Sequence, residues 1–266
     1  MMRFPSATSS RTALLVLSIT FLFPDVIPSH GAAGVSAAPA TANGLLPPRT
    51  AATTSLARLA VMFQPNQGQA APSVDFLARG PGYALLLQRD RIRVRLRSLS
   101  EEPAELSMKL TGAGRLPPVQ GEGLLPGTTN YFVGDNPARW RTGLPSYARA
   151  RYPGVYPGID LVLYGEQGRL EYDFVVEPGA DPSAIGLEFD GAETVELGGQ
   201  GDLLLRIAGG ELRQHKPVAY QLRGERREFV ESSFRLAGRR VSFHVGEFDR
   251  SRTLFIDPVL SYSTFL

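Results

Sequence analysis

The stretch YPGIDLVLYGEQGRLEYDFVV, residues 156–176, decides the fold. In residues 169–176 apolar side chains occupy every even position and mostly polar side chains the odd positions, which is typical of a half-buried strand. Residues 159–164 alternate in the same way, and the short segment 165–168 between the two runs is flanked by glycines. The sequence therefore predicts an antiparallel β-hairpin.

Two carboxylates, Glu171 and Asp173, fall on one face of the second strand of this hairpin. Their Cα atoms would lie about 6.6 to 6.8 Å apart, a spacing that also suits the acid pairs of glycoside hydrolases. Acidic residues at alternate positions are equally typical of the solvated face of an antiparallel strand. We favour a solvated, mainly architectural pair that contacts Arg169 or Arg151, and keep catalysis as the alternative.

The rest of the chain also consists of short alternating or apolar runs separated by Gly and Pro. No run shows three helical turns with an apolar stripe, so the predicted fold class is all-β, with little helix. An antiparallel β-sandwich, or two sandwiches packed side by side, fits many short strands. Short helical turns are expected at Pro137 and at residues 181–184. The further expected strands are 59–63, 74–78, 83–88, 91–97, 105–110, 130–133, 185–189, 203–207, 218–222, 228–236, 241–245 and 254–256.

Composition excludes several classes of site. The chain has 28 basic and 26 acidic residues among 266, so a net charge of +2 gives no reason to expect a nucleic-acid partner. It has no cysteine, which excludes disulfides, thiolate metal sites and cysteine nucleophiles. His30 lies in the leader, and the two histidines that remain, His215 and His244, are too few for a histidine-based metal site or relay. We therefore predict no cofactor and no metal site.

The N-terminal region has the features of a secretion signal. Arginines precede an apolar run at residues 13–23, and small residues follow it. We expect a signal peptide and leader over 1–42, a flexible linker over 43–57 and one β domain over 58–258. The apolar run is too short to span a membrane, and no transmembrane segment is expected in the mature chain. These features predict an exported protein that is extracellular or at the cell surface, with the periplasm as an alternative.

Arginines occupy every second position from Arg89 to Arg97. Arg91, Arg93 and Arg95 could form a docking strip for an anionic glycan, because a guanidinium group pairs with carboxylate, sulfate or phosphate. The alternative, which we favour, is an exposed strand face whose charge is balanced by acidic residues such as Glu105 on neighbouring strands.

Trp140 is the single tryptophan of the chain, and the region after it is rich in tyrosine. Trp140, Tyr147 and Tyr152 are therefore candidates for a ligand-binding patch, for instance for a polysaccharide. Packing in or at the edge of the core is the more common role of such side chains.

Several motifs in a fixed order together carry a family resemblance. They are FQPNQGQ (63–69), NYFVGDNPARWRTGLPSY (130–147), VYPGIDLVLYGEQGRLEYDFVVEPGADPSAI (155–185), GDLLL (201–205), PVAYQ (217–221) and IDPVLSYSTFL (256–266). The chain resembles the domain of unknown function that precedes seven-bladed β-propeller (SBBP) repeats in secreted bacterial proteins. The resemblance implies an exported β-rich module whose partners are propeller repeats or another surface protein. Residues 259–266 resemble the first strand of a propeller repeat that is cut short.

Three functions are consistent with these features. We expect a non-catalytic secreted module that supports or caps a β-propeller and contributes to interaction at the cell surface. The alternatives are a carbohydrate-active enzyme that uses Glu171 and Asp173, and an anionic-glycan-binding module that uses the strand Arg89–Arg97.

Overall fold

The computed structural model describes residues 61–80, 83–96, 104–114, 116–132, 134–166, 169–208, 210–258 and 260–264. The expected signal peptide, leader and linker, residues 1–57, lie outside these residues. The described residues form antiparallel strands and two short 3-10 turns and contain no α-helix, which confirms the predicted all-β class. They also contain no helix with the length and hydrophobicity that a membrane span requires.

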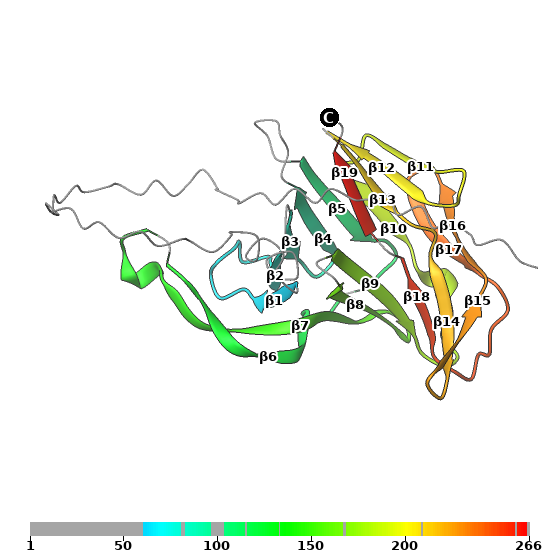
Figure 1. Ribbon diagram of the computed structural model, residues 1–266, viewed down its shortest axis with the longest axis horizontal. Coiled ribbons are helices and arrows are strands. Elements are labelled where there is room, and N and C mark those ends of the chain that lie inside the picture. The colour runs from blue at the N-terminus through cyan, green and yellow to red at the C-terminus, as the bar shows by residue number, and fades with distance from the viewer. Residues whose placement is uncertain are drawn as a thin grey trace, which may run out of the picture.

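The strands are numbered in chain order (Figure 1). The first nine are β1 (Met62–Pro65), β2 (Phe76–Gly80), β3 (Tyr83–Leu87), β4 (Arg91–Leu96), β5 (Ala104–Leu110), β6 (Gln120–Tyr131), β7 (Arg141–Tyr156), β8 (Ile159–Glu166) and β9 (Arg169–Val176). The remaining ten are β10 (Leu187–Asp190), β11 (Thr194–Leu197), β12 (Leu203–Ile207), β13 (Gly210–Gln214), β14 (Val218–Arg223), β15 (Arg226–Val230), β16 (Ser232–Ala237), β17 (Arg240–Val245), β18 (Leu254–Asp257) and β19 (Leu260–Thr264).

The strands form two sheets, a large sheet A and a small sheet B. Sheet A has 15 strands, in the order β15-β14-β18-β9-β8-β7-β1-β2-β3-β4-β5-β10-β17-β16, with β6 paired to β7 outside this path. Sheet B has four strands, in the order β11-β12-β13-β19. The predicted hairpin is β8–β9, and it lies in the interior of sheet A, between β7 and β18.

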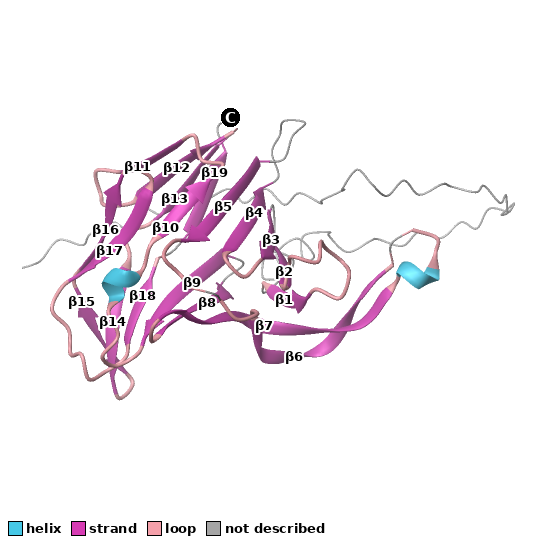
Figure 2. Ribbon diagram, turned by 180° about the vertical axis from the view of Figure 1, so that it is seen from behind, coloured by secondary structure: helices cyan, strands magenta, loops and turns pink. Residues whose placement is uncertain are grey.

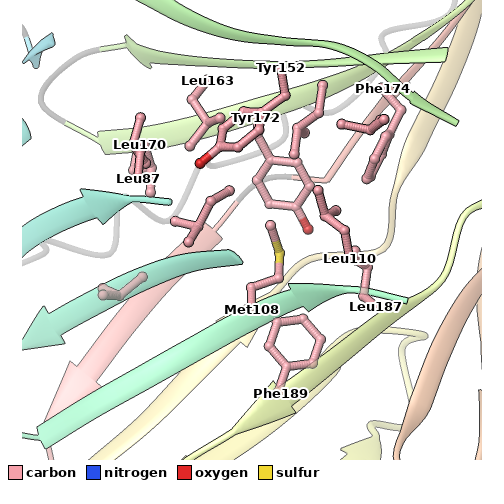
Figure 3. Packing of buried hydrophobic residues seen from close by; sticks show 14 of the residues in the cluster. Leu87, Met108, Leu110, Tyr152, Leu163, Leu170, Tyr172, Phe174, Leu187 and Phe189 are labelled. Carbon is pink, nitrogen blue, oxygen red and sulfur yellow. The ribbon is translucent and has the colours of Figure 1, made fainter. Parts of the chain in front are cut away.

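Sheet A bends so that two of its parts face each other across the core. Side chains from the β7–β9 region, such as Tyr152 and Phe174, point toward Met108 of β5 and Phe189 of β10 (Figure 3). The ring of Phe174 also lies 5.6 Å from that of Phe243 in β17, centroid to centroid. The layers of the sandwich are therefore largely parts of one continuous sheet.

Sheet B closes the same core. The hydroxyl of Tyr172 in β9 donates to Oε1 of Gln214 in β13 at 3.1 Å, and buried leucines of β12 and β13 join the main apolar cluster. Burial of large aromatic and aliphatic side chains supplies about 1.5 to 3 kcal/mol for each one, which is the main stabilising term here. The described strands thus share one core rather than the two packed sandwiches kept as an alternative.

Strands β6 and β7 form a long two-stranded ribbon that projects from the body of the molecule (Figures 1 and 2). The sequence predicts only its segment 130–133, because Gly and Pro interrupt residues 120–156 and resemble loop punctuation. The pairing register shifts between Leu124 and Thr128, which marks a bulge at Pro126 and Gly127. The glycines and the proline are thus accommodated inside a strand.

Other local predictions are confirmed or refined. The two expected helical turns are present at Pro137–Arg139 and Pro182–Ala184, with Asn136 and Asp181 as their N-caps. The single run expected over 228–236 is two strands, β15 and β16, separated at Glu231. Strands β11 and β13 are not predicted.

Candidate functional site

The two carboxylates of the β8–β9 hairpin do not lie on a solvated face. Glu171 has an exposed fraction of only 4%, and Asp173 is half-buried. The interpretation of a wet strand face is therefore wrong. Strand β18 pairs with the free edge of the hairpin, so β9 is an interior strand of sheet A, and side chains of both β8 and β18 flank Asp173.

Strand β18 brings a third carboxylate, Asp257, beside Asp173. The register pairs Val175 with Phe255 and Phe174 with Ile256, and one further step places Asp173 opposite Asp257. Opposite positions on one sheet face are separated by about 4.5 to 5.5 Å between Cβ atoms, and like charges at this separation repel. The hydroxyl of Tyr164 in β8 donates to Oδ1 of Asp173 at 3.0 Å.

These surroundings make Asp173 a weak acid. Its pKa is raised from 3.8 to about 7, mainly by burial and then by the charges of Asp257 and Glu171, while the Tyr164 hydrogen bond and Arg227 oppose the rise. Burial also raises the pKa of Asp257, with Arg227 opposing this and Glu166 adding to it. Oδ1 of Asp257 is buried and has no hydrogen-bond partner among the described residues.

Aromatic side chains border this acidic cluster. Tyr220 of β14 stacks on Phe255 with ring centroids 5.1 Å apart, and the Arg227 guanidinium lies 4.3 Å from the centre of the Tyr220 ring. Tyr164 is kept protonated, because burial and the Asp173 charge raise its pKa. A neutral Tyr164 can only donate to Asp173 and cannot act as a base there.

Neither of two surface hollows in the described part of the chain borders this cluster. These hollows, of about 220 and about 400 Å³, are lined by other residues. No group of three His, Asp or Glu side chains in that part of the chain is placed to hold a metal ion. What the arrangement does chemically is favour a protonated Asp173 near neutral pH, because burial and then the neighbouring carboxylate of Asp257 disfavour its charged form.

Arg151 does not contact Glu171 or Asp173, although the sequence suggested it as a partner. Its Nε donates to Oδ2 of Asp160 at 2.9 Å, and its Nη1 lies 3.0 Å from Oε1 of Glu122 in β6. Oδ1 of Asp160 accepts from the backbone N–H of Gly154 at 2.6 Å. This network joins the base of the ribbon to β8.

The arginines of β4 pair with acidic neighbours, as favoured from the sequence. Arg93 and Arg95 both pair with Glu105 of β5, at 3.4 and 2.8 Å, and Arg91 pairs with Asp90 at 2.9 Å. Arg89 lies in the turn before β4, 3.8 Å from Asp75. Arg97 lies outside the described residues. Because Arg93 and Arg95 share the single carboxylate of Glu105, these ion pairs neutralise part of the positive charge of the strand.

The three aromatic candidates are separated by the fold. Tyr152 packs among the core side chains (Figure 3) and has an exposed fraction of 1%, so it does not contribute to a surface patch. Tyr147 is half-buried, and its ring packs on Gly121 and on Phe76, 6.0 Å away between centroids. Trp140 alone stays at the surface, beside Phe132 at the end of the ribbon.

Gln64, inside the FQPNQGQ motif, holds the ribbon and was not singled out from the sequence. Its buried side chain donates to Oγ1 of Thr129 at 2.6 Å and to Oγ of Ser146 at 3.1 Å, and its Oε1 accepts from the Tyr131 hydroxyl. The strand expected from the sequence ends at Phe63, and no pattern in the sequence marks Gln64. The motif is therefore a structural brace.

Arg141 provides a second brace at the far end. Its Nε donates to the backbone oxygen of Gln67 at 2.7 Å, and its Nη1 donates to the oxygens of Ala138 and Trp140. Gly68 has a φ of +106°, and a Cβ there would lie 3.0 Å from Arg141 Nε, so glycine suits both the turn and the close approach.

Comparison with known proteins gives a family but no activity. The family described as a domain of unknown function (DUF7948) matches residues 63–259, about three quarters of the chain, so the chain belongs to this family. No curated protein and no solved structure matches the chain.

Proposed function

We propose that this member of the DUF7948 family is an exported, non-catalytic β module that supports or caps an adjoining β-propeller and takes part in interaction at the cell surface. The observation that carries the non-catalytic part is the environment of Glu171 and Asp173. One side chain is buried and the other accepts a tyrosine hydrogen bond, and neither lines one of the two surface hollows described above.

A glycosidase needs both carboxyl groups to reach the scissile bond and a water or the sugar ring between them. The competing function, a carbohydrate-active enzyme, would require Glu171 to become accessible from its present position. The burial of Glu171 argues against such a movement. The raised pKa of Asp173 has a structural cause in burial and in the charge of Asp257.

The scaffold part of the proposal is supported by β19. This strand begins next to the end of the family match and pairs with β13 from Gly210 to Gln214. The segment that resembles the start of a propeller repeat is thus hydrogen-bonded into sheet B, where it is the last strand in the order. A neighbouring domain that continued from this strand would be held close to the module.

The experiment is a product assay with the full chain and soluble polysaccharides, in which new reducing ends are counted. We expect none above the level given by Glu171→Gln. Release of products that Glu171→Gln abolishes, while the fold is retained, would overturn the non-catalytic assignment.

The scaffold role is tested with a purified seven-bladed propeller added to the full chain. Amide hydrogen exchange in β19 and β13 is expected to slow in its presence, because a docked domain covers the outer edge of sheet B. Unchanged exchange at saturating propeller would contradict the scaffold role and leave the product assay unaffected.

A further inference from the structure

The end of the β6–β7 ribbon carries the exposed aromatic pair Phe132 and Trp140. We call residues 130–132 and 134–142 the ribbon tip. Phe132 has an exposed fraction of 62% and Trp140 of 38%, and the two rings meet edge to face with centroids 5.1 Å apart. The indole N–H of Trp140 donates to the backbone oxygen of Gly134 at 3.0 Å, which fixes the orientation of the ring.

Hydrogen bonds hold the ribbon tip in place. The Gln64 brace ties both ribbon strands to β1, and the Arg141 brace ties the tip to the segment after β1. Asn136 caps the 3-10 turn through Ala138 N–H at 3.0 Å, and Oδ1 of Asn130 accepts from Gly143 N–H at 2.8 Å. A surface whose side chains are already ordered loses little conformational entropy when a ligand binds.

The polar groups around the rings indicate the kind of ligand. Asp135 and Arg139 are both exposed and of opposite charge, and the third charged side chain of the tip, Arg141, is half-buried with its guanidinium hydrogen-bonded to three backbone oxygens, so the exposed charges of the tip balance. Exposed Asn and Thr side chains lie in the same segment and can donate and accept hydrogen bonds. Aromatic faces with a rim of neutral hydrogen-bonding groups suit a pyranose ring, which presents C–H groups on its face and hydroxyls at its edge.

Two other occupants fit less well. A lipid surface would require a continuous apolar tip, whereas the described residues between the rings, 134–139, are exposed and largely polar or small. A strand added along β6 would meet the bulge at Pro126 and Gly127, which interrupts a regular edge.

We infer that the ribbon tip is a binding site for neutral polysaccharide, with a sugar ring packed against Phe132 and Trp140. This inference rests on the proposed non-catalytic role and places the interaction at one site. Gln64 and Arg141 act as positioning residues for the site, because they hold the ribbon through polar side chains and backbone oxygens, including the backbone oxygen of Trp140.

The test uses the intrinsic fluorescence of the full chain. Because Trp140 is the only tryptophan, its emission reports directly on the tip. Dextran, mannan, laminarin and xylan are titrated in turn, with calorimetry on the same samples. We expect a saturable change in emission with at least one of them, and a Kd at least tenfold weaker for Phe132→Ala. Phe229→Ala is the matched control, because Phe229 is an aromatic residue with an exposed fraction of 71% on β15, outside the ribbon.

The possible results distinguish a failure of the ribbon-tip site from a failure of the proposed non-catalytic function. Binding by calorimetry that leaves Trp140 emission and the Phe132→Ala affinity unchanged would overturn the tip site while the non-catalytic role stands. No binding to any of the four polymers, or an emission change only with phosphatidylcholine vesicles, would also overturn it. Products released from a bound polymer would instead contradict the proposed function.

Discussion

Replacing Asp173 by Asn should remove a penalty that the folded protein carries at neutral and alkaline pH. The pKa of this carboxyl rises from 3.8 to about 7, mainly through burial and then through Asp257. A folded state that binds a proton more tightly than the unfolded state is most stable below pH 3.8 for this group. The contribution of protonated Asp173 to the free energy of unfolding is then lost as the pH rises through about 7.

The size of the effect follows from the size of the shift. A rise from 3.8 to about 7 corresponds to about 4 kcal/mol between the two limits of pH. Because Asp173 retains partial contact with water, we expect roughly 2 to 4 kcal/mol. The amide of the Asn variant can still accept the Tyr164 hydrogen bond, so little else is lost.

The assay is urea unfolding of wild type and Asp173→Asn at pH values from 4 to 8.5, followed by circular dichroism. The two should have similar free energies of unfolding near pH 4, and the variant should be more stable by about 2 to 4 kcal/mol at pH 8.5. Glu196→Gln, a change at an exposed carboxylate, is the control for loss of one negative charge. A difference between wild type and Asp173→Asn that does not change with pH would refute the reasoning.

Four further results are expected. Gln64→Ala should destabilise the fold by about 1 to 3 kcal/mol, because it leaves hydrogen-bonding partners in the ribbon unsatisfied. Amide hydrogen exchange in β6 and β7 should become faster, and unchanged exchange there would rule out a brace. Tyr152→Phe should leave thermal stability unchanged or raised by up to about 1 kcal/mol, since its buried hydroxyl has no partner among the described residues; a clear loss by calorimetry would show otherwise. Arg95→Ala should change the free energy of unfolding by less than about 1 kcal/mol and leave binding to heparin unchanged. Weaker heparin binding would instead support the anionic-glycan-binding function. Phe174→Ala should cost about 3 to 5 kcal/mol by denaturant unfolding, and a cost under about 1 kcal/mol would contradict its central place in the core.

The local pattern of the sequence predicts the β8–β9 hairpin but not its surroundings. Alternation identifies the inward face, with Tyr172 and Phe174, and the turn residues identify where the strands end. The same alternation suggests that Glu171 and Asp173 face water. That inference fails because β18, about 80 residues later in the chain, pairs beside β9 and supplies Asp257. Long-range pairing leaves no periodic signal at Asp173 itself.

The ribbon shows a second limit of sequence reading. Its glycines and prolines disfavour strand in isolation, and the fold compensates with contacts from Gln64, which lies 65 and 82 residues from Thr129 and Ser146. Tyr147 and Tyr152 look alike in a tyrosine-rich segment, yet Tyr147 is half-buried at the base of the ribbon and Tyr152 lies in the core. For Trp140, the sequence pattern allows both a surface position and packing in or at the edge of the core, and it does not decide between them.

The most direct measurement is amide hydrogen exchange of the full chain with and without a polysaccharide that shifts Trp140 emission. Binding without catalysis at the ribbon predicts protection confined to residues 130–143, with β8 and β9 unchanged. Protection centred on residues 164–176 instead, around Glu171 and Asp173, would contradict the account and return the carboxylates to the position of an active site.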